Sequence, residues 1–170
     1  MEQINVSDFE GVFEIMDQSF PQDERRKKEE QRALFSVPEY KVFVRREGGK
    51  IIAFIAVWEF ERFLYVEHFA VSPKKRGGGI GADVLNELMK SYDVPVCLEV
   101  EPPVTETAVR RITFYERNGM FFNDYDYVQP PLSQGQNSLP LKIMSSGKRI
   151  SKEQFEDIKS TLYKKVYKIK

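Results

Sequence analysis

The stretch "PKKRGGGIGADVL", residues 73–85, places three glycines directly behind three basic residues and ahead of an apolar periodic segment. Glycine is a poor residue to place before a helix unless the backbone there must approach another group closely. Successive backbone N–H groups in such a turn, at the start of a helix, form a cradle for an anion. A purely structural turn needs one or two glycines, so the pattern favours a phosphate-binding loop.

Apolar periodicity and turn residues predict the elements around this loop. The expected helices cover residues 7–20, 23–35, 80–92, 105–119 and 151–169, and the expected strands cover residues 40–46, 50–58, 62–73, 94–101, 120–128 and 139–144. The glycine pair at 48–49 predicts a hairpin, and the third strand follows closely enough to be an antiparallel neighbour of the second. Ser7 with Glu10, and Ser151 with Gln154, match the capping-box pattern of a helix start.

This order of elements indicates a mixed α and β fold of the α+β class. The succession of strand, glycine loop, helix and strand is a βαβ crossover joined to an antiparallel sheet. The chain has 170 residues, with no internal repeat and no linker-like segment. We therefore expect a single domain over residues 1–170.

The composition excludes several classes of function. Lysine and arginine total 26 and aspartate and glutamate total 26, whereas nonspecific nucleic-acid binding needs an excess of positive charge. The single cysteine, Cys97, rules out an internal disulfide, and with one histidine in the chain no zinc site is expected. No apolar run approaches the ~20 residues of a membrane span, and the first residues do not resemble a signal peptide. We expect a cytoplasmic protein that uses no metal and binds neither nucleic acid nor membrane.

Two other nucleotide-binding motifs compete for the glycine loop. Gly77, Gly79 and Ala82 satisfy the dinucleotide fingerprint G-x-G-x-x-G/A. In that fold, however, the glycines follow the first strand almost directly, whereas residues 72–76 intervene here and the preceding strands are antiparallel. A Walker loop also fails, because no Gly-Lys-Ser/Thr follows.

Two segments resemble the GNAT superfamily of N-acetyltransferases. "FAVSPKKRGGGIGADVL" is similar to its pyrophosphate loop, Arg/Gln-x-x-Gly-x-Gly/Ala, which here is Arg76, Gly79 and Gly81. "ITFYERNGMFF" is similar to its second segment, and the resemblance covers residues 1–146. It implies a central, mostly antiparallel twisted sheet of about seven strands flanked by helices, with a splayed parallel strand pair at the cofactor. Residues 148–170 lie outside the resemblance and are expected to add a C-terminal helical extension.

The resemblance also implies the activity and the cofactor site. Members transfer the acetyl group of acetyl-CoA to a primary amine, by direct attack within a ternary complex. The pyrophosphate would lie on a run of seven residues, namely Arg76, Gly77, Gly78, Gly79, Ile80, Gly81 and Ala82. Pantetheine would pair with the backbone of Phe69, Ala70 and Val71. The acceptor is expected to be an amine of a small molecule or peptide, and the protein a monomer or homodimer.

Tyr115 matches the family tyrosine that contacts the cofactor and protonates the departing thiolate. A phenol suits a thiolate better than an alkoxide. The alternative is that Tyr115 is a core aromatic beside Phe114. Many members carry an asparagine where this chain has Ala108, so that cofactor contact is absent or comes from elsewhere, for instance from Arg110 or Arg111.

Glu67 is the candidate to take the proton of the amine, acting through a water. Strand alternation places it with Phe69 on one face and places His68 on the other, unless a β-bulge rotates the histidine. Burial is expected to raise the pKa of Glu67 and make it a better base. His68, Glu99, Glu101 and solvent water are the alternatives.

The acceptor itself is not readable, although the residues after "SFP", 24–26, and the aromatic strand at 120–128 are candidates to line its site. A second reading, of another class, is a noncatalytic acyl-CoA sensor or interaction module with the same fold. Such a module would keep the glycine loop but have no use for Tyr115. Trp58 is expected in the core, and Cys97, among apolar neighbours, is expected to be inert.

Overall fold

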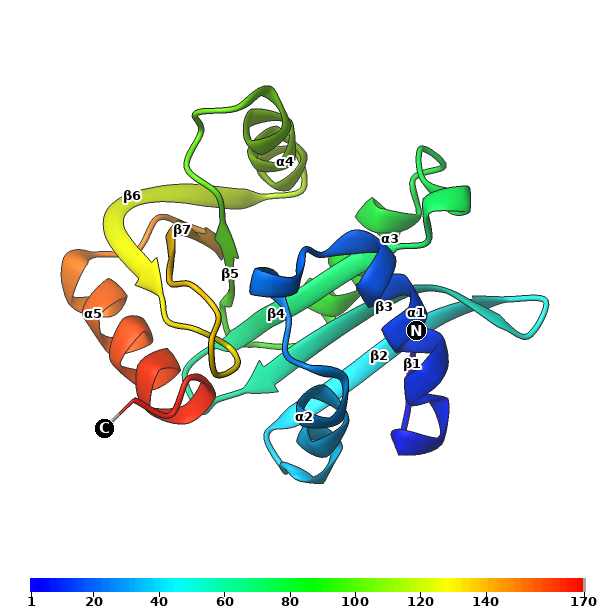
Figure 1. Ribbon diagram of the computed structural model, residues 1–170. Coiled ribbons are helices and arrows are strands. Elements are labelled where there is room, and N and C mark those ends of the chain that lie inside the picture. Colours follow the sequence, from blue (N-terminus) through cyan, green and yellow to red (C-terminus); the bar gives the residue numbers. More distant parts are fainter. Residues whose placement is uncertain (170) are drawn as a thin grey trace. The chain divides into compact units, whose positions relative to one another are not determined.

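The apolar run "KIIAFIAVW" becomes a long strand buried on both faces, which organises the N-terminal part of the chain. The computed structural model describes residues 1–169, and the chain divides into two units, Met1–Val96 and Cys97–Lys170. The elements of the first unit (Figure 1) are β1 (Glu2–Gln3), η1 (Val6–Asp8), α1 (Phe9–Ser19), η2 (Gln22–Glu24), α2 (Lys28–Ala33), η3 (Leu34–Ser36), β2 (Tyr40–Glu47), β3 (Lys50–Glu59), β4 (Leu64–Val71), η4 (Pro73–Lys75) and α3 (Ile80–Lys90).

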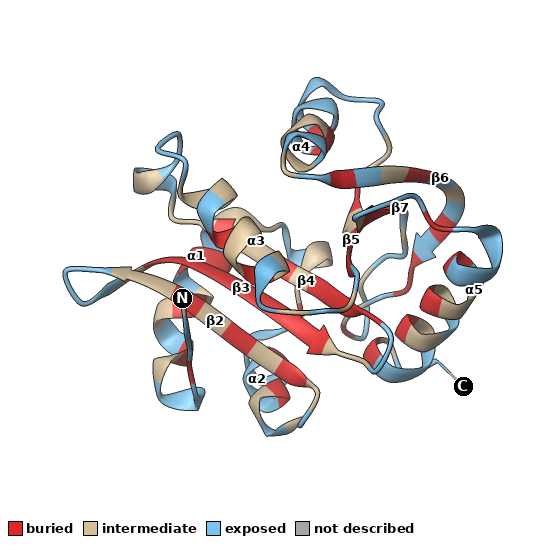
Figure 2. Ribbon diagram, turned by 180° about the vertical axis from the view of Figure 1, so that it is seen from behind, coloured by how far each residue is buried: buried red, intermediate tan, exposed pale blue. Residues whose placement is uncertain are grey.

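Strands β1 to β4 pair in sequence order, each antiparallel to the next. Helices α1 and α2 cover one face of these strands and α3 covers the other, as the two opposite views show (Figures 1 and 2). Residues 53–57 of β3 are completely inaccessible to solvent because helices pack on both sides of them. Trp58 is 2% exposed, which confirms its place in the core.

A β-bulge interrupts the pairing of β3 with β4. Ala56 pairs with His68 and Val57 pairs with Val66, so that Glu67 is the extra residue on β4. A bulge turns neighbouring side chains away from strict alternation and increases the local twist. Glu67 and His68 therefore both carry buried side chains, each 2% exposed.

The second unit begins one residue into β5 (Val96–Val100). Its other elements are α4 (Glu106–Arg117), β6 (Met120–Gln129), β7 (Leu139–Ser146), α5 (Lys152–Thr161) and a π-helical turn, η5 (Leu162–Val166). Its strands lie in the order β5-β7-β6 and are antiparallel. Helix α5 packs on β6 through Phe155, whose ring stacks on Tyr125 at 4.7 Å. The hydroxyl of Tyr167, just after η5, donates to both carboxylate oxygens of Glu99 on β5, at 2.8 and 3.0 Å.

The mixed α and β class and the expected seven strands flanked by helices are confirmed. The capping box at Ser151 and Gln154 forms as expected. At the first helix that expectation is wrong, because Asn5 accepts the N–H of Ser7 instead and Asp8 makes no side-chain cap. The expected helix over residues 23–35 is broken into η2, α2 and η3, and β1 was not expected. The single domain and the splayed parallel strand pair stay predictions.

Two general properties of the described residues bear on function. None of their helices has the length and apolarity needed to cross a bilayer. Nor do residues 1–169 contain a group of three or more His, Cys, Asp or Glu side chains that could hold a metal ion.

Candidate active site

The glycine loop leads into α3 through two residues with left-handed backbone. Gly77 and Gly79 have φ values of +83° and +80°, and a Cβ on either would meet no other atom within 4 Å. Glycine is therefore required by the backbone conformation rather than by crowding. The loop is exposed, so its backbone is accessible to a ligand.

The first turn of α3 is free to receive an anion. Gly79 is the N-cap and offers no side-chain cap, and the first intrahelical bond runs from Asp83 N to Gly79 O at 3.1 Å. The N–H groups of Ile80, Gly81 and Ala82 precede that bond, so helix geometry leaves them without intrahelical partners. An uncapped N-terminus of this kind attracts a phosphate through its N–H groups and the helix dipole.

Arg76 links this loop to the end of β4. Its Nε donates to the carbonyl of Val71 at 3.1 Å, and its Nη2 donates to Ser19 Oγ at 3.0 Å. The structure thus brings together the two groups of expected cofactor residues, those of the loop and those of the strand. Phe69, Ala70 and Val71 are the last three residues of β4 and pair with residues 53–55 of β3.

Glu67 is paired with an arginine that the sequence pattern placed in the expected helix over residues 23–35. Arg26 Nη1 lies 2.7 Å from Glu67 Oε1, and the two side chains are 6% and 2% exposed. Arg26 comes from the segment between η2 and α2, which passes over β4 (Figure 1). Two further contacts hold this segment in place, a hydrogen bond of 2.8 Å between His68 Nε2 and the Glu24 carbonyl and an edge-on contact of 4.9 Å between the rings of Phe20 and His68.

The pair sets the ionisation of Glu67. Burial opposes the charged form, but the Arg26 guanidinium and the adjacent His68 outweigh it and lower the pKa of Glu67 to about 2. The expectation that burial would raise this pKa is wrong, because burial brought a cation with it. Glu67 is an anion at neutral pH with little tendency to take a proton. Burial, together with the charge of Glu67, raises the pKa of Tyr40 far above the usual range of a phenol.

His68 faces the same cluster as Glu67 because of the bulge. A carbonyl oxygen only accepts, so the hydrogen bond to Glu24 requires a proton on Nε2 of His68. The other ring nitrogen, Nδ1, lies 3.4 Å from Glu67 Oε2. Both nitrogens therefore face protein groups.

Tyr115 belongs to the second unit and lies on α4. The helix begins after Thr105, whose side chain accepts the N–H of Ala108 at 3.1 Å, so Ala108 is buried at the helix start. Tyr115 is half-buried, with its ring edge-on to Phe114 at 5.3 Å. Burial raises the pKa of its phenol to about 12, against a smaller lowering by Arg111. The phenol therefore keeps its proton throughout the neutral range.

The remaining candidate bases lie on or beside β5. Glu99 accepts the hydroxyls of Tyr127 and Tyr167. Glu101 pairs with Arg111 of α4 at 3.2 Å, and both side chains are more than 40% exposed. Of the two arginines considered for cofactor or acceptor contacts, Arg111 thus forms an ion pair with a residue of its own unit.

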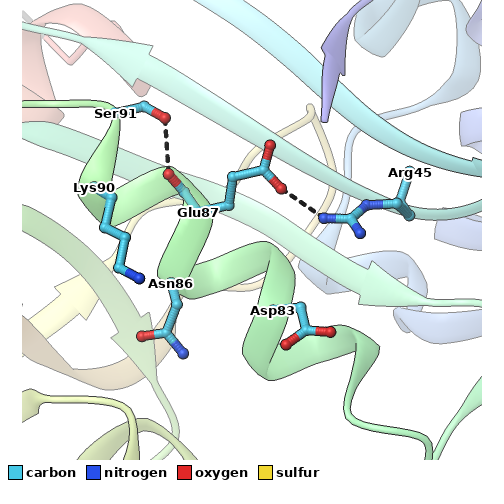
Figure 3. Close-up of a pocket in the computed structure, with 6 residues that line it drawn as sticks. All are labelled: Arg45, Asp83, Asn86, Glu87, Lys90 and Ser91. Carbon is cyan, nitrogen blue, oxygen red and sulfur yellow. Dashed lines mark hydrogen bonds and ion pairs between the residues drawn. The ribbon is translucent and has the colours of Figure 1, made fainter.

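A shallow pocket lies elsewhere on the first unit, along α3. Six residues line it, namely Arg45, Asp83, Asn86, Glu87, Lys90 and Ser91 (Figure 3). Glu87 accepts from Arg45 at 2.5 Å within it, and the lining carries charges of both signs. It has no glycine cradle, and charged side chains of both signs line it, so it does not compete with the loop as a cofactor site.

The loop, β4 and Tyr115 stay predicted site residues. Arg26 was expected only as one of residues 24–26, the candidates to line the acceptor site, and its ion pair with Glu67 was not expected. The run "DERRKKEEQ" has the composition of an exposed helix, yet Arg26 is 5% exposed. A signal was available, because a glutamate on a buried strand needs a cationic partner and a basic run following Pro21 is an obvious source. Cys97 is completely buried, and burial raises the pKa of its thiol to about 12, in keeping with an unreactive side chain.

All three comparisons with known proteins give acetyltransferases, and two of them name the GNAT family. A family model described as an acetyltransferase (GNAT) domain matches residues 38–119, which run from just before β2 to the end of α4. A solved structure from Bacteroides thetaiotaomicron, assigned to the GNAT family of acetyltransferases, is 36% identical. The similarity covers 99% of this chain and 98% of that chain, with a TM-score of 0.92.

Two further matches are more distant or shorter. YjbC of Bacillus subtilis (strain 168), assigned as an acetyltransferase, is 32% identical over 108 residues, 62% of this chain and 54% of that protein. The match therefore spans about half the length of this curated relative. The ribosomal-protein-alanine N-acetyltransferase of Escherichia coli shares the fold, at 18% identity, with a TM-score of 0.66 and coverage of 89% and 95% of the two chains.

Proposed function

Because this chain belongs to the GNAT family of acetyltransferases, we propose that it is an acetyl-CoA-dependent N-acetyltransferase acting on a primary amine of a small molecule or peptide. The observation that carries the proposal is the glycine loop, with two left-handed glycines leading into the uncapped N-terminus of α3. Acetyl-CoA, when bound, supplies a thioester whose acetyl group passes to the amine nitrogen as the C–S bond breaks.

The chain's own residues fit this co-substrate. The amides from Gly77 to Ala82 would receive the pyrophosphate, and the absence of side chains at Gly77 and Gly79 leaves the approach open. Arg76 adds positive charge and is already bonded to the carbonyl of Val71. The backbone of residues 69–71 would hold the pantetheine arm.

Tyr115 would supply a proton to the departing sulfur. Its phenol, with a pKa of about 12, is protonated whenever the thiolate forms, and it regains its proton from water after transfer. Glu67 would contribute a fixed negative charge on the acceptor side rather than act as a base, because Arg26 keeps it ionised. Water is then the proposed proton acceptor for the amine.

The noncatalytic acyl-CoA module remains the second candidate. The Arg26–Glu67 pair is the observation that favours it, because a binding module has no need of a free base. Turnover separates the two functions. A module of this kind would bind acetyl-CoA and release no CoA.

The test is the release of free CoA thiol when the protein is mixed with acetyl-CoA and a panel of primary amines. We expect release that depends on both the amine and the protein, with the acetylated amine identified by mass spectrometry. Binding of acetyl-CoA without release on any amine of the panel would support the noncatalytic module instead.

A further inference from the structure

His68, the one histidine of the chain, is buried on β4 and contacts the stretch that follows α1 at two points. Its ring lies edge-on to Phe20 at 4.9 Å, and its Nε2 lies 2.8 Å from the carbonyl oxygen of Glu24. Because a carbonyl oxygen only accepts, Nε2 carries a proton and donates it to Glu24. One side chain thus holds both the start and the middle of residues 20–26, which we call the crossing segment.

The ends of the crossing segment are attached to the same part of the first unit. Arg76 of the glycine loop donates to Ser19 at 3.0 Å, and Arg26 Nη1 lies 2.7 Å from Glu67 Oε1. Both of these contacts join side chains, which can rotate while the backbone behind them moves. The bond from His68 goes to a backbone carbonyl, so it fixes the course of the main chain itself.

The crossing segment lies against the part of β4 that the acetyl group would reach. The pyrophosphate is proposed to bind the loop after β4, and pantetheine the backbone of residues 69–71. The arm would therefore run from the end of β4 back toward its start, and His68 is the next residue in that direction. An amine has to approach the thioester at this end of the arm, where the crossing segment is held.

We propose that His68 is a positioning residue for the amine acceptor, because its Nε2–H holds the Glu24 carbonyl and keeps residues 20–26 beside the end of the pantetheine arm. This inference rests on the proposed N-acetyltransferase function and adds a residue to its acceptor site. His68 acts through the backbone of the crossing segment and takes no proton during the reaction.

The surroundings of the ring favour this role over that of a general base. A base has to lie within hydrogen-bond reach of the proton it removes, directly or through one water. Nε2 already carries a proton and donates it to Glu24. Nδ1 has no hydrogen-bond partner among residues 1–169, but it lies 3.4 Å from Glu67 Oε2, and both side chains are 2% exposed. The nitrogen that could accept a proton therefore faces a buried protein group rather than solvent.

Two variants separate the hydrogen bond from the ring. His68→Phe keeps an aromatic ring beside Phe20 and loses the N–H, whereas His68→Gln loses the ring and carries an amide N–H that can reach the Glu24 carbonyl. Neither variant can take a proton from the amine. Ser36→Ala is the matched control, because it removes a side-chain bond to a backbone carbonyl, that of Ala33 at 2.8 Å, outside the crossing segment.

Steady-state kinetics use acetyl-CoA and whichever amine of the panel gives CoA release. We expect His68→Phe to raise the KM of the amine roughly three- to tenfold, the range that the loss of one hydrogen bond produces in an equilibrium constant. His68→Gln and Ser36→Ala should keep that KM within about twofold of the wild type, and kcat should change by less than about twofold in all three variants. The affinity for acetyl-CoA, measured by calorimetry, should also be unchanged.

A spectroscopic measurement tests the hydrogen bond in the wild type, whether or not the variants fold. The untagged chain has one histidine, so its ring N–H gives a single imidazole resonance in a ¹⁵N-correlated spectrum. A proton on Nε2 that is held by Glu24 should exchange slowly and be visible at neutral pH. The backbone amides of residues 22–26 should exchange faster in His68→Phe than in the wild type. A ring proton that exchanges rapidly, or that lies on Nδ1 alone, would overturn the proposal.

The kinetic outcomes distinguish this proposal from the proposed function. An unchanged amine KM in His68→Phe would overturn the role of His68 and leave the N-acetyltransferase function standing. A fall in kcat in both His68 variants at unchanged KM would also overturn it, because the ring would then take part in proton transfer. No CoA release by the wild type with any amine would overturn the N-acetyltransferase function, and the acceptor role of His68 with it.

Discussion

At the residue scale, the Arg26–Glu67 pair shows how one partner decides what a buried acid can do. The sequence placed Glu67 on a buried strand, which is confirmed, but strict alternation missed the bulge at Glu67, and burial suggested a base. The partner comes from 41 residues earlier in the chain, and its charge reverses the effect of burial. Local pattern cannot reveal a contact of that sequence separation, which depends on the course of the segment after α1.

We predict that Arg26→Gln lowers the free energy of unfolding at pH 7 by about 3 kcal/mol, because it leaves a buried carboxylate uncompensated. The low folded pKa of Glu67 means that the wild-type pair stabilises the protein above the ordinary glutamate pKa of about 4.3, and that this stability is lost as the pH falls toward 2. The difference between variant and wild type should therefore shrink as the pH falls toward 2. It should begin to shrink at higher pH because, without Arg26, burial raises the pKa of Glu67 in the variant. Urea unfolding at several pH values measures it.

Two controls accompany this prediction. Arg32→Gln, at an exposed pair, should change stability by no more than about 0.5 kcal/mol. Adding Glu67→Gln to the Arg26 variant should recover much of the loss, since both charges are then gone. A loss that is independent of pH would mean that Arg26 acts by packing alone.

We predict that Tyr115→Phe lowers kcat by ~10²-fold while acetyl-CoA affinity changes little. The substitution keeps the ring beside Phe114 and removes only the proton donor. Steady-state kinetics and an acetyl-CoA titration give the two quantities. Tyr92→Phe, which removes a hydroxyl bonded to Glu59, is the control and should retain full kcat. Full kcat in the Tyr115 variant would return that tyrosine to the role of a core aromatic.

At the element scale, the sequence predicts helices and strands best where the apolar periodicity agrees with the turn and capping residues at their ends. The strands over residues 40–58 and the helix after the glycine loop come out within a few residues of their observed limits, because alternation, the glycine pair and the apolar spacing all point the same way. Helix 105–119 is likewise bounded by the Thr105 cap and by Gly119, which has a φ of +84°.

The elements that were missed are those that depend on tertiary contacts. β1 is two residues long and forms by pairing with β2. The break of residues 23–35 into short helices accompanies the burial of Arg26. The bulge on β4 leaves no signal in its composition, yet it decides that His68 and Glu67 face the same cluster. The π-helical turn after α5 also leaves no signal in the sequence, because the apolar spacing continues through it.

We predict that Ser151→Ala lowers the stability of the protein by about 1 kcal/mol, because it removes the side chain that accepts the N–H of Gln154 in the capping box of α5. Ser160→Ala is the matched control, since Ser160 is exposed inside the same helix and alanine is the better helix former. Thermal unfolding of both variants measures the difference. Equal midpoints for the two variants would show that the cap contributes nothing.

At the scale of the whole molecule, the residues assigned to cofactor and catalysis come from both units of the chain. The loop, β4 and the Arg26–Glu67 pair belong to residues 1–96, and Tyr115 belongs to residues 97–170. The family resemblance supplied this division of roles from the sequence. The residues alone predicted the anion cradle and the order of elements along the chain, but not the reaction.

The central claim is that the glycine loop is the cradle of acetyl-CoA. Calorimetric titration of acetyl-CoA into the wild type, Gly79→Val and Gly135→Val tests it most directly. Gly135 is an exposed glycine with a φ of +88° and nothing within 4 Å of a Cβ, so its variant carries comparable backbone strain outside the loop. We predict saturable binding by the wild type and by Gly135→Val, and binding weakened at least tenfold in Gly79→Val. No heat of binding in the wild type, or normal affinity in Gly79→Val, would contradict the account.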